Sequence, residues 1–250
     1  HLLCAYLRPS KIDGAKHAWA ILALLTKRIR QTWPDVQIIF RGDSGFCRRK
    51  MLRWCESYGV EYVVGIGGNK RLKQFGAALI EQSEEAYEQT AEKQRLFGEF
   101  NYAAATWDRE RRVIIKAEHT SQGANTRFIL TSLEGDPQAL YDEVYCARGD
   151  MENRIKEQQL DLYADRTSCH NWWPNQLRLM LSSFAYVLFD HIRRTALRNT
   201  RLAHATSATI RNKLIRIGAV IVRNTRRIRF HLSTAYPRQE LLVLVAARLQ

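Results

Sequence analysis

The first seventy residues alternate between short apolar runs and stretches with helical spacing. Apolar residues at helical spacing predict helices over Lys16–Thr32 and Cys47–Tyr58. Apolar, β-branched runs predict buried strands at Val36–Phe40 and Glu61–Ile66, and His1–Leu7 is a further strand candidate. The order strand, helix, strand, helix, strand is typical of an α/β domain, in which helices cover a central sheet.

The pattern changes after residue 70. Arg71–Gln94 is polar and indicates a helix, and a long polar helical stretch follows later at Asp136–Asp165. Trp173–His191 has the pattern of an apolar helix, and Leu241–Leu249 is a second apolar helix or strand. Between the two polar helical stretches, three segments with short turns predict an antiparallel insertion: Phe97–Thr106, Arg112–Glu118 and Arg127–Leu133.

These elements predict four regions along the chain. Residues 1–70 form an α/β core, residues 71–135 a β-rich insertion, and residues 136–190 a helical region. Residues 191–250 form a C-terminal tail that we expect to be helical. No apolar run is long enough to cross a bilayer. The five cysteines lack a C-x-x-C pair, which argues against a disulfide framework or a structural zinc site.

The net charge of +14 is concentrated in this tail. Residues 191–250 carry 13 basic residues and one acid, Glu240, whereas residues 1–190 carry 26 basic and 24 acidic residues. A run of cations is usually a solvated helix face, but such faces normally interleave both signs. From His191 to Arg238 there is no carboxylate. We therefore expect the tail to contact nucleic acid.

An acidic residue follows the predicted strand Val36–Phe40, in the segment Arg41-Gly42-Asp43-Ser44-Gly45. Loops at the carboxyl ends of strands in open α/β sheets commonly build functional sites. The flanking glycines let other groups approach closely. A turn in which Asp43 caps the next helix explains the same residues equally well. Both interpretations stay open at the level of the sequence.

The second polar helical stretch carries four side chains with different chemistry. Tyr145, Arg148, Glu152 and Gln159 lie at offsets of 0, 3, 7 and 14 residues. On a regular α-helix they project within an arc of about 60°. A hydroxyl, a guanidinium, a carboxylate and an amide would then line one face. An ordinary i,i+4 ion pair between Arg148 and Glu152 is the commoner explanation for such spacing.

Taken together, these segments resemble the DDE transposases of bacterial insertion sequences, and in detail the insertion-sequence 1380 group. That group has the helix signature Tyr-x2-Arg-x3-Glu-x6-Lys, which Tyr145–Glu152 matches closely. Phe40–Phe46 resembles the segment around the second acid, and Gly67–Leu72 resembles the segment after the next strand. The resemblance implies a ribonuclease-H-like core with an antiparallel β-rich insertion before the catalytic helix.

Two features depart from that family. Gln159 stands where the signature has a lysine, and Lys156 lies about one turn earlier. The family's first catalytic Asp lies on a strand upstream of the present ones, and Asp13 does not match it. We therefore expect the chain to be a C-terminal fragment that holds two of the three acids and is inactive by itself.

The resemblance implies an enzyme that cleaves and transfers DNA strands at insertion-sequence ends. Asp43 and Glu152 would hold two Mg²⁺ ions for phosphoryl transfer. Arg148 would contact a DNA phosphate or hold Glu152 in place, and Tyr145 would hydrogen-bond a terminal phosphate. The implied partner is double-stranded DNA, both the transposon ends and the target, and a homodimer would bind it. The resemblance further implies a protein of the bacterial cytoplasm that is associated with the nucleoid and does not bind a membrane.

Further DNA contacts are expected outside the signature helix. Lys70 and Arg71 follow a buried strand and are placed to meet phosphates, and Arg226 and Arg227 lie in the basic tail. In relatives, an aromatic residue from the insertion stacks on a flipped base, a role open to Trp107. A half-buried tryptophan of a sheet is the commoner explanation for Trp107.

Two other functions stay open. A DNA-binding transposase remnant without catalysis would act through the basic tail, and Gln159 together with the missing acid favours it. A ribonuclease-H-like nuclease that acts on RNA or on hybrids is the third candidate. The β-rich insertion argues against it, because the smaller nucleases lack such an insertion.

Overall fold

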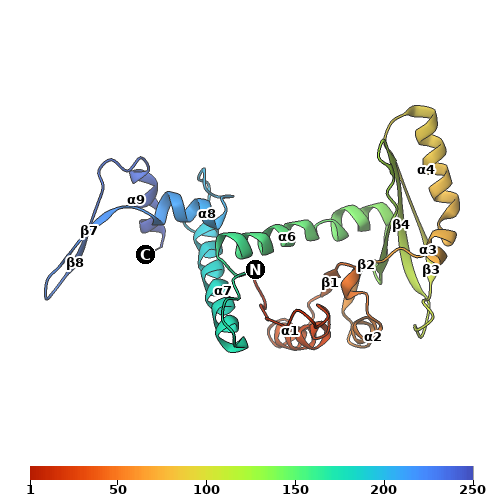
Figure 1. The fold of residues 1–250 in the computed structure, drawn as a ribbon, viewed down its shortest axis with the longest axis horizontal. Helices are drawn as coiled ribbons and strands as arrows, with labels where there is room; N and C mark the ends of the chain where they lie inside the picture. Colours follow the sequence, from red (N-terminus) through yellow and green to blue (C-terminus); the bar gives the residue numbers. More distant parts are fainter. Residues whose placement is uncertain (250) are drawn as a thin grey trace. The chain divides into compact units, whose positions relative to one another are not determined.

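A computed structural model describes residues 1–249 of the chain (Figure 1). The chain divides into two compact units. One unit, called unit 2, comprises Arg8–Met151. The other, unit 1, comprises His1–Leu7 together with the chain from Glu152 onward.

Unit 2 is built on a six-stranded mixed sheet with the order β1-β2-β6-β4-β3, in which β5 pairs with β4. β1 and β2 are parallel, and all other pairs are antiparallel. The sheet therefore confirms a mixed α/β fold, and the three strands predicted between residues 97 and 133 pair antiparallel within it. Its strands are β1 (Ile39–Gly42), β2 (Glu61–Ile66), β3 (Gln94–Tyr102), β4 (Arg111–Thr120), β5 (Gly123–Ala124) and β6 (Arg127–Thr131).

The strand β2 lies inside the sheet and is buried on both faces. A strand in that position reads as a continuous apolar run, which is why the sequence predicted its bounds correctly. The buried strand predicted at Val36–Phe40 is wrong in its bounds and in its burial. The observed strand β1 begins at Ile39 and lies at the edge of the sheet, so that only β2 pairs with it. Ile39 is 39% exposed there.

Helices cover one face of this sheet. The helices α1 (Ala18–Thr32), α2 (Arg49–Ser57), α3 (Lys70–Phe75) and α4 (Ala77–Thr90) all contribute side chains to one core. Figure 1 shows α4 running along β3 and β4. Successive strand residues point to opposite faces, so Val64, Ile115 and Leu130 belong to this core.

The opposite face of the sheet has its own core. Val63, Ile114 and Ile129 point there and pack against Leu140 and Tyr141. These two residues belong to the helical stretch predicted at residues 136–165. The prediction of a helix is confirmed, but the stretch is not a uniform α-helix. It consists of α5 (Pro137–Ala139), the π-helical turn η2 (Leu140–Tyr145), α6 (Arg148–Lys156) and the π-helical turn η3 (Glu157–Asp161).

Unit 1 contains a smaller core. Phe189, Leu197, Ile210, Leu214 and Val245 are buried together. The expectation of a helical tail holds only in part, because two strands pair as a hairpin between its helices. Its elements are α7 (Trp172–Arg194), α8 (Ser207–Ile210), the π-helical turn η4 (Arg211–Ile215), β7 (Ala219–Arg223), β8 (Ile228–Leu232) and α9 (Gln239–Arg248).

The segment His1–Leu7 is not a strand, contrary to the prediction. Its backbone bonds to side chains of α7 instead of to a neighbouring strand. The Leu7 amide donates to Gln176 Oε1 at 2.8 Å, and Trp172 Nε1 donates to the Leu7 carbonyl at 3.1 Å. Gln176 also donates to the Ala5 carbonyl at 3.3 Å. Apolar composition alone does not distinguish this packing from strand pairing.

In the described part of the chain, no helix combines the length and the apolar character that a membrane span requires. The five cysteines are free thiols. Burial raises the pKa of Cys47 to about 11 and of Cys55 to about 12, so both thiols stay protonated near neutral pH. Their role in the fold is therefore that of small packing groups.

The sheet also buries an ionised carboxylate at Glu118 on β4. Burial by itself raises the pKa of Glu118, but hydrogen bonds from three neighbours outweigh it and lower the pKa to about 2. Lys93 Nζ lies 3.0 Å from the carboxylate and Lys116 Nζ lies 3.1 Å away. Asn125 Nδ2 donates to it at 2.9 Å. Glu118 therefore stabilises the fold only while it is charged.

We predict that Glu118→Gln lowers the free energy of unfolding by about 3 kcal/mol at pH 7, because it leaves the buried Lys116 without its counterion. The contribution of Glu118 is fully present above the ordinary pKa of 4.5 and is lost as the pH falls towards 2. The difference between variant and wild type should thus shrink by about 2 kcal/mol at pH 3. Urea unfolding at both pH values measures it. An equal difference at both pH values would contradict the prediction, and exposed Glu84→Gln is the control.

Candidate functional site

Asp43 lies directly after β1, at the carboxyl end of the parallel pair β1–β2. The last residue of β1, Gly42, pairs with Val64 of β2. Asp43 is exposed, and its Oδ1 accepts a hydrogen bond from the Gly45 amide at 2.8 Å. This bond caps the short 3-10 turn η1 (Ser44–Phe46). The capping role is confirmed, although the capped element is this turn and not the helix α2.

A glycine on the next strand makes room for an aromatic hydroxyl beside the Asp43 loop. A β-carbon on Gly65 would lie 2.8 Å from Tyr145 Oη, 3.0 Å from the Ser44 amide nitrogen and 3.4 Å from the Asp43 carbonyl carbon. The first two distances are shorter than ordinary van der Waals contacts. Only a residue without a side chain therefore lets these groups come together.

Tyr145 is fixed in this place by its own surroundings. It ends the turn η2, is half-buried, and packs against Tyr141 with 5.5 Å between ring centroids. The Arg148 guanidinium lies over the Tyr145 ring at 5.2 Å from its centroid. Arg41 Nη1 donates to the Val144 carbonyl at 3.0 Å and so ties the end of β1 to η2. Unit 2 thus brings together Asp43, Tyr145 and Arg148.

Arg48 also contacts the loop that contains Asp43. Its Nε donates to the Gly45 carbonyl at 3.0 Å, and its Nη2 lies 2.7 Å from Asp13 Oδ2. Asp13 also accepts from the Ala15 amide at 3.0 Å. The structure therefore gives Asp13 a partner and a turn-forming role next to the Asp43 loop.

The prediction that four side chains line one face of a regular helix is wrong. Tyr145 and Gln159 lie in π-helical turns, which contain more residues per turn than an α-helix. The angular spacing holds only for Arg148 and Glu152, which both lie in α6. Glu152 and Gln159 are exposed and belong to unit 1. A shared metal site of Asp43 and Glu152 therefore stays a prediction.

The segment around Lys70 is the start of a short helix. Asn69 caps α3 by accepting from the Leu72 amide at 2.9 Å. Lys70 and Arg71 are exposed, and Arg71 Nη1 donates to the Ala103 carbonyl at 3.2 Å. Contact of either residue with phosphate stays a prediction.

Trp107 is half-buried, and its ring is engaged inside unit 2. It packs edge-on against Tyr102 with 5.7 Å between centroids, and the Arg111 guanidinium lies 5.2 Å from its ring centre. This environment favours a packing role. Stacking on a base stays a prediction and would require the ring to leave these partners.

A divalent cation such as Mg²⁺ prefers carboxylate and water oxygens. Asp43 offers such a donor, since its cap uses Oδ1 and a carboxylate has a second oxygen. Among residues 1–249, no three His, Cys, Asp or Glu side chains are grouped so that they could hold a metal ion. The chemistry of Asp43 therefore fits a metal, and further ligands have to come from water, DNA or other carboxylates.

Sequence reasoning missed the role of Gly65, although a signal for it is present. Gly65 stands alone in the apolar run Glu61–Ile66. An isolated glycine inside a strand weakens it and often marks a close approach of another group. That signal points to the position where Tyr145 meets the Asp43 loop.

Comparison with known protein families finds a family whose model matches the whole chain. The model of a family described as transposase DDE domain group 1 matches residues 1–250. No curated protein matches the chain at a significant level.

We predict that Gly65→Ala destabilises unit 2 by about 1–3 kcal/mol, because the new methyl group overlaps Tyr145 Oη and the Ser44 amide. Gly67→Ala is the matched control, since a β-carbon there meets no atom within 4 Å in the described structure, and it should change stability by less than about 0.5 kcal/mol. Urea unfolding measures both variants.

A double-mutant cycle identifies the atom responsible. Tyr145→Phe removes the hydroxyl, so Gly65→Ala should cost less stability when it is combined with Tyr145→Phe than in the wild type. Equal costs in both backgrounds would show that Tyr145 Oη does not lie against Gly65.

Proposed function

Because the chain belongs to the transposase DDE domain group 1 family, we propose that it cleaves DNA at the ends of an insertion sequence and transfers the strands to a target. The observation that carries this proposal is the position of Asp43. An acid at the carboxyl end of a parallel strand pair is a common place for a catalytic group, because the strand holds it rigidly. The hydroxyl of Tyr145 next to this loop adds a group that can donate a hydrogen bond.

The proposed acids are Asp43 and Glu152, which supply oxygen ligands for Mg²⁺. Bound divalent cations stabilise the negative charge of phosphoryl transfer and lower the pKa of bound water. Asp43 offers its second oxygen for this purpose while Oδ1 keeps the loop closed through Gly45. Glu152 is exposed on α6, so that a ligand can reach it from solvent.

The proposed DNA contacts at this site are Tyr145 and Arg148. The Tyr145 hydroxyl donates to a terminal phosphate, and the Arg148 guanidinium above the Tyr145 ring supplies positive charge nearby. A cation held against an aromatic face loses less side-chain freedom when it binds a phosphate. Lys70, Arg71 and Trp107 are proposed to extend the contact surface.

We also propose that unit 2 is a ribonuclease-H-like core of the insertion-sequence 1380 group. Three features support this assignment. β1 and β2 are parallel and joined through α2, an antiparallel insertion follows, and the chain then returns in the helical stretch that carries Tyr145 and Arg148. The expected partner is double-stranded DNA bound by a homodimer.

A DNA-binding protein without catalysis is the second candidate. Gln159 favours it, because an exposed amide stands where the family signature has a cation. The two candidates differ in one measurement. The enzyme cleaves DNA that contains insertion-sequence ends, whereas the non-catalytic protein only binds it.

We predict that Asp43→Asn and Glu152→Gln each reduce cleavage of end-containing DNA on the order of a thousandfold, which corresponds to about 4 kcal/mol of transition-state stabilisation. Both replacements keep the shape of the side chain, and the amide oxygen introduced by Asp43→Asn can still accept the bond from Gly45. DNA affinity should change by less than about threefold. A cleavage assay with Mg²⁺ measures the rate, and a gel-shift titration measures the DNA affinity. Both use the full-length protein.

The exposed acids Asp35 and Glu85 provide matched controls. Asp35→Asn and Glu85→Gln remove the same charge outside the signature segments and should leave cleavage unchanged. Full cleavage by both Asp43→Asn and Glu152→Gln would reject the assigned roles. Binding without cleavage by the wild type would favour the second candidate.

A further inference from the structure

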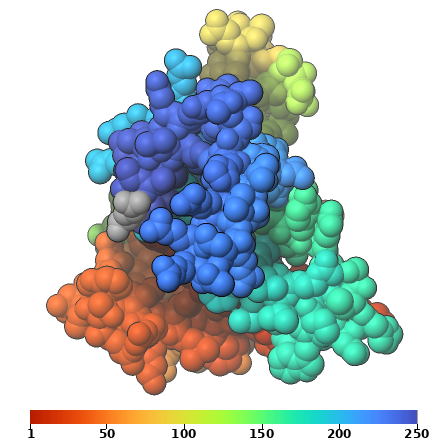
Figure 2. Space-filling model, turned by 90° about the vertical axis from the view of Figure 1, so that its left-hand side faces the viewer, coloured from red at the N-terminus to blue at the C-terminus, as the bar shows by residue number. Residues whose placement is uncertain are grey.

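The hairpin β7–β8 of unit 1 is exposed on both of its faces. Every residue of the two strands is exposed, and Figure 1 shows the pair extending from α8 and α9. The blue tail residues face the viewer in the space-filling view (Figure 2). A two-stranded hairpin is marginally stable by itself and gains from a partner along its length. The exposed strands are therefore a candidate binding surface.

The register divides the hairpin into two different faces. Residues directly opposite each other on antiparallel strands share a face, as do alternate residues of one strand. Val220 pairs with His231, and Val222 pairs with Arg229. These four residues form one face, which combines β-branched and basic side chains. The other face is mainly apolar and consists of Ala219, Ile221, Arg223, Ile228, Phe230 and Leu232.

The turn of the hairpin presents two arginines. The backbone N–H of Asn224 donates to the Arg227 carbonyl at 3.0 Å and closes the turn. Asn224 Oδ1 accepts from the Arg226 amide at 3.0 Å and from the Arg227 amide at 2.8 Å. The backbone of the tip is therefore held by Asn224, while both arginine side chains remain exposed.

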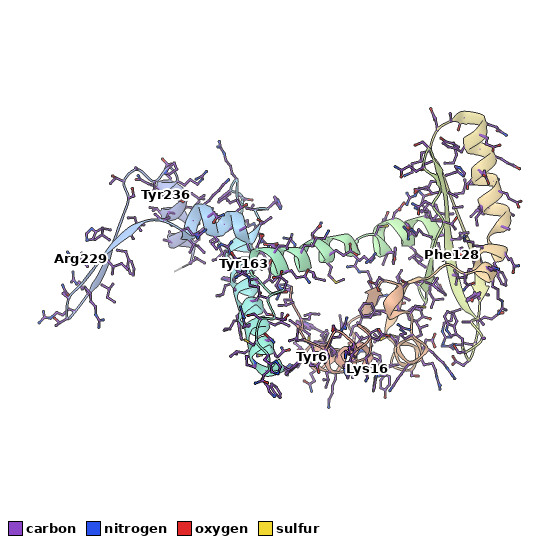
Figure 3. The ribbon with its side chains drawn as sticks, viewed as in Figure 1. Tyr6, Lys16, Phe128, Tyr163, Arg229 and Tyr236 are labelled. Carbon is purple, nitrogen blue, oxygen red and sulfur yellow. The ribbon has the colours of Figure 1, made fainter. Side chains whose placement is uncertain are left out.

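The base of the hairpin is also held in place. The Tyr236 hydroxyl donates a hydrogen bond to the Lys213 carbonyl of η4. Figure 3 labels Tyr236 at this end and Arg229 on the strands. The hairpin thus extends from a base that is held in place, and its arginines lie along the strands and at the tip.

We propose that the β7–β8 hairpin binds double-stranded DNA by entering the major groove as a two-stranded ribbon. The major groove is about 12 Å wide and admits such a ribbon. Arg226 and Arg227 contact phosphates at the tip. Arg229 and the neighbouring valines lie along the strands, where guanidinium groups bond to guanine edges and apolar groups meet thymine methyl groups. The inference rests on the proposed function only for its choice of DNA as the partner.

Charge decides between DNA and a second copy of the chain. The hairpin contains four arginines and no carboxylate, and no carboxylate occurs between His191 and Arg238. Pairing of two hairpins through their apolar faces would cover Arg223 of each copy while neither hairpin offers it a carboxylate, which is unfavourable. DNA supplies one negative charge for about every 1.7 Å of its axis. The duplex is therefore the complementary partner.

The test is the salt dependence of DNA binding by the full chain. Arg226→Gln/Arg227→Gln should weaken binding to a duplex of about 30 base pairs at least about tenfold at low salt and reduce the slope of log K against log salt by about 2, since each phosphate contact contributes about 0.9. Lys27→Gln/Arg28→Gln removes the same charge from exposed positions on α1 of unit 2 and should leave the slope unchanged. Circular dichroism verifies that both variants are folded.

A hairpin variant that binds with the slope of the wild type overturns this inference but leaves the cleavage proposal intact. Conversely, if Asp43→Asn abolishes cleavage but leaves the salt slope unchanged, the acid acts in cleavage and the hairpin binds DNA independently of it. Ile221→Ser/Phe230→Ser tests the alternative partner. If this variant lowers the mass in light scattering without weakening DNA binding, the hairpin is an interface between copies of the chain, which also overturns the inference.

Discussion

The close approach at Gly65 is the constraint on which the arrangement of unit 2 around Asp43 depends. The strand β2 lies between β1 and β6, so a side chain at residue 65 would point into space already filled by Tyr145 Oη and the Ser44 amide. Tyr145 in turn packs on Tyr141, which belongs to the core on that face of the sheet. The position of a polar hydroxyl at the site is thus set by apolar packing and by one missing side chain.

Two glutamates five residues apart have different physical roles. Glu157 is buried in unit 1 and accepts bonds from the Ser207 amide and hydroxyl, both at 2.6 Å, and from Arg193. Burial alone raises the pKa of Glu157, but these partners lower it, so it stays charged and joins η3 to α7 and α8. Glu152 is exposed on α6. A buried carboxylate with every partner inside the protein anchors the fold, whereas a ligand from solvent can reach an exposed one.

The sequence predicted the elements whose pattern follows from burial. The run Glu61–Ile66 matches β2 because that strand is covered on both faces, and Asp43 lies at a strand end as expected. Periodicity could not reveal the edge position of β1, which depends on a distant pairing, or the π-helical turns around α6, because a uniform spacing was assumed. β8 does alternate apolar and basic residues from Ile228 to Leu232, and the hairpin was missed because this short period-2 signal lies in a tail that its charge led us to expect as helical.

The basic tail shows why a charge count identifies a partner class but not a binding surface. Several of its arginines are used inside unit 1. Arg193 pairs with Glu157, Arg211 Nη1 donates to the Asp161 carbonyl at 2.5 Å, and Arg248 Nη1 donates to the Arg198 carbonyl at 2.8 Å. These cations hold helices together and contribute less to a contact with phosphate. The arginines of the hairpin are exposed, and they are set on a backbone that its turn and its base keep in place. The hairpin therefore carries four exposed arginines on one ribbon, where geometry and electrostatics act together.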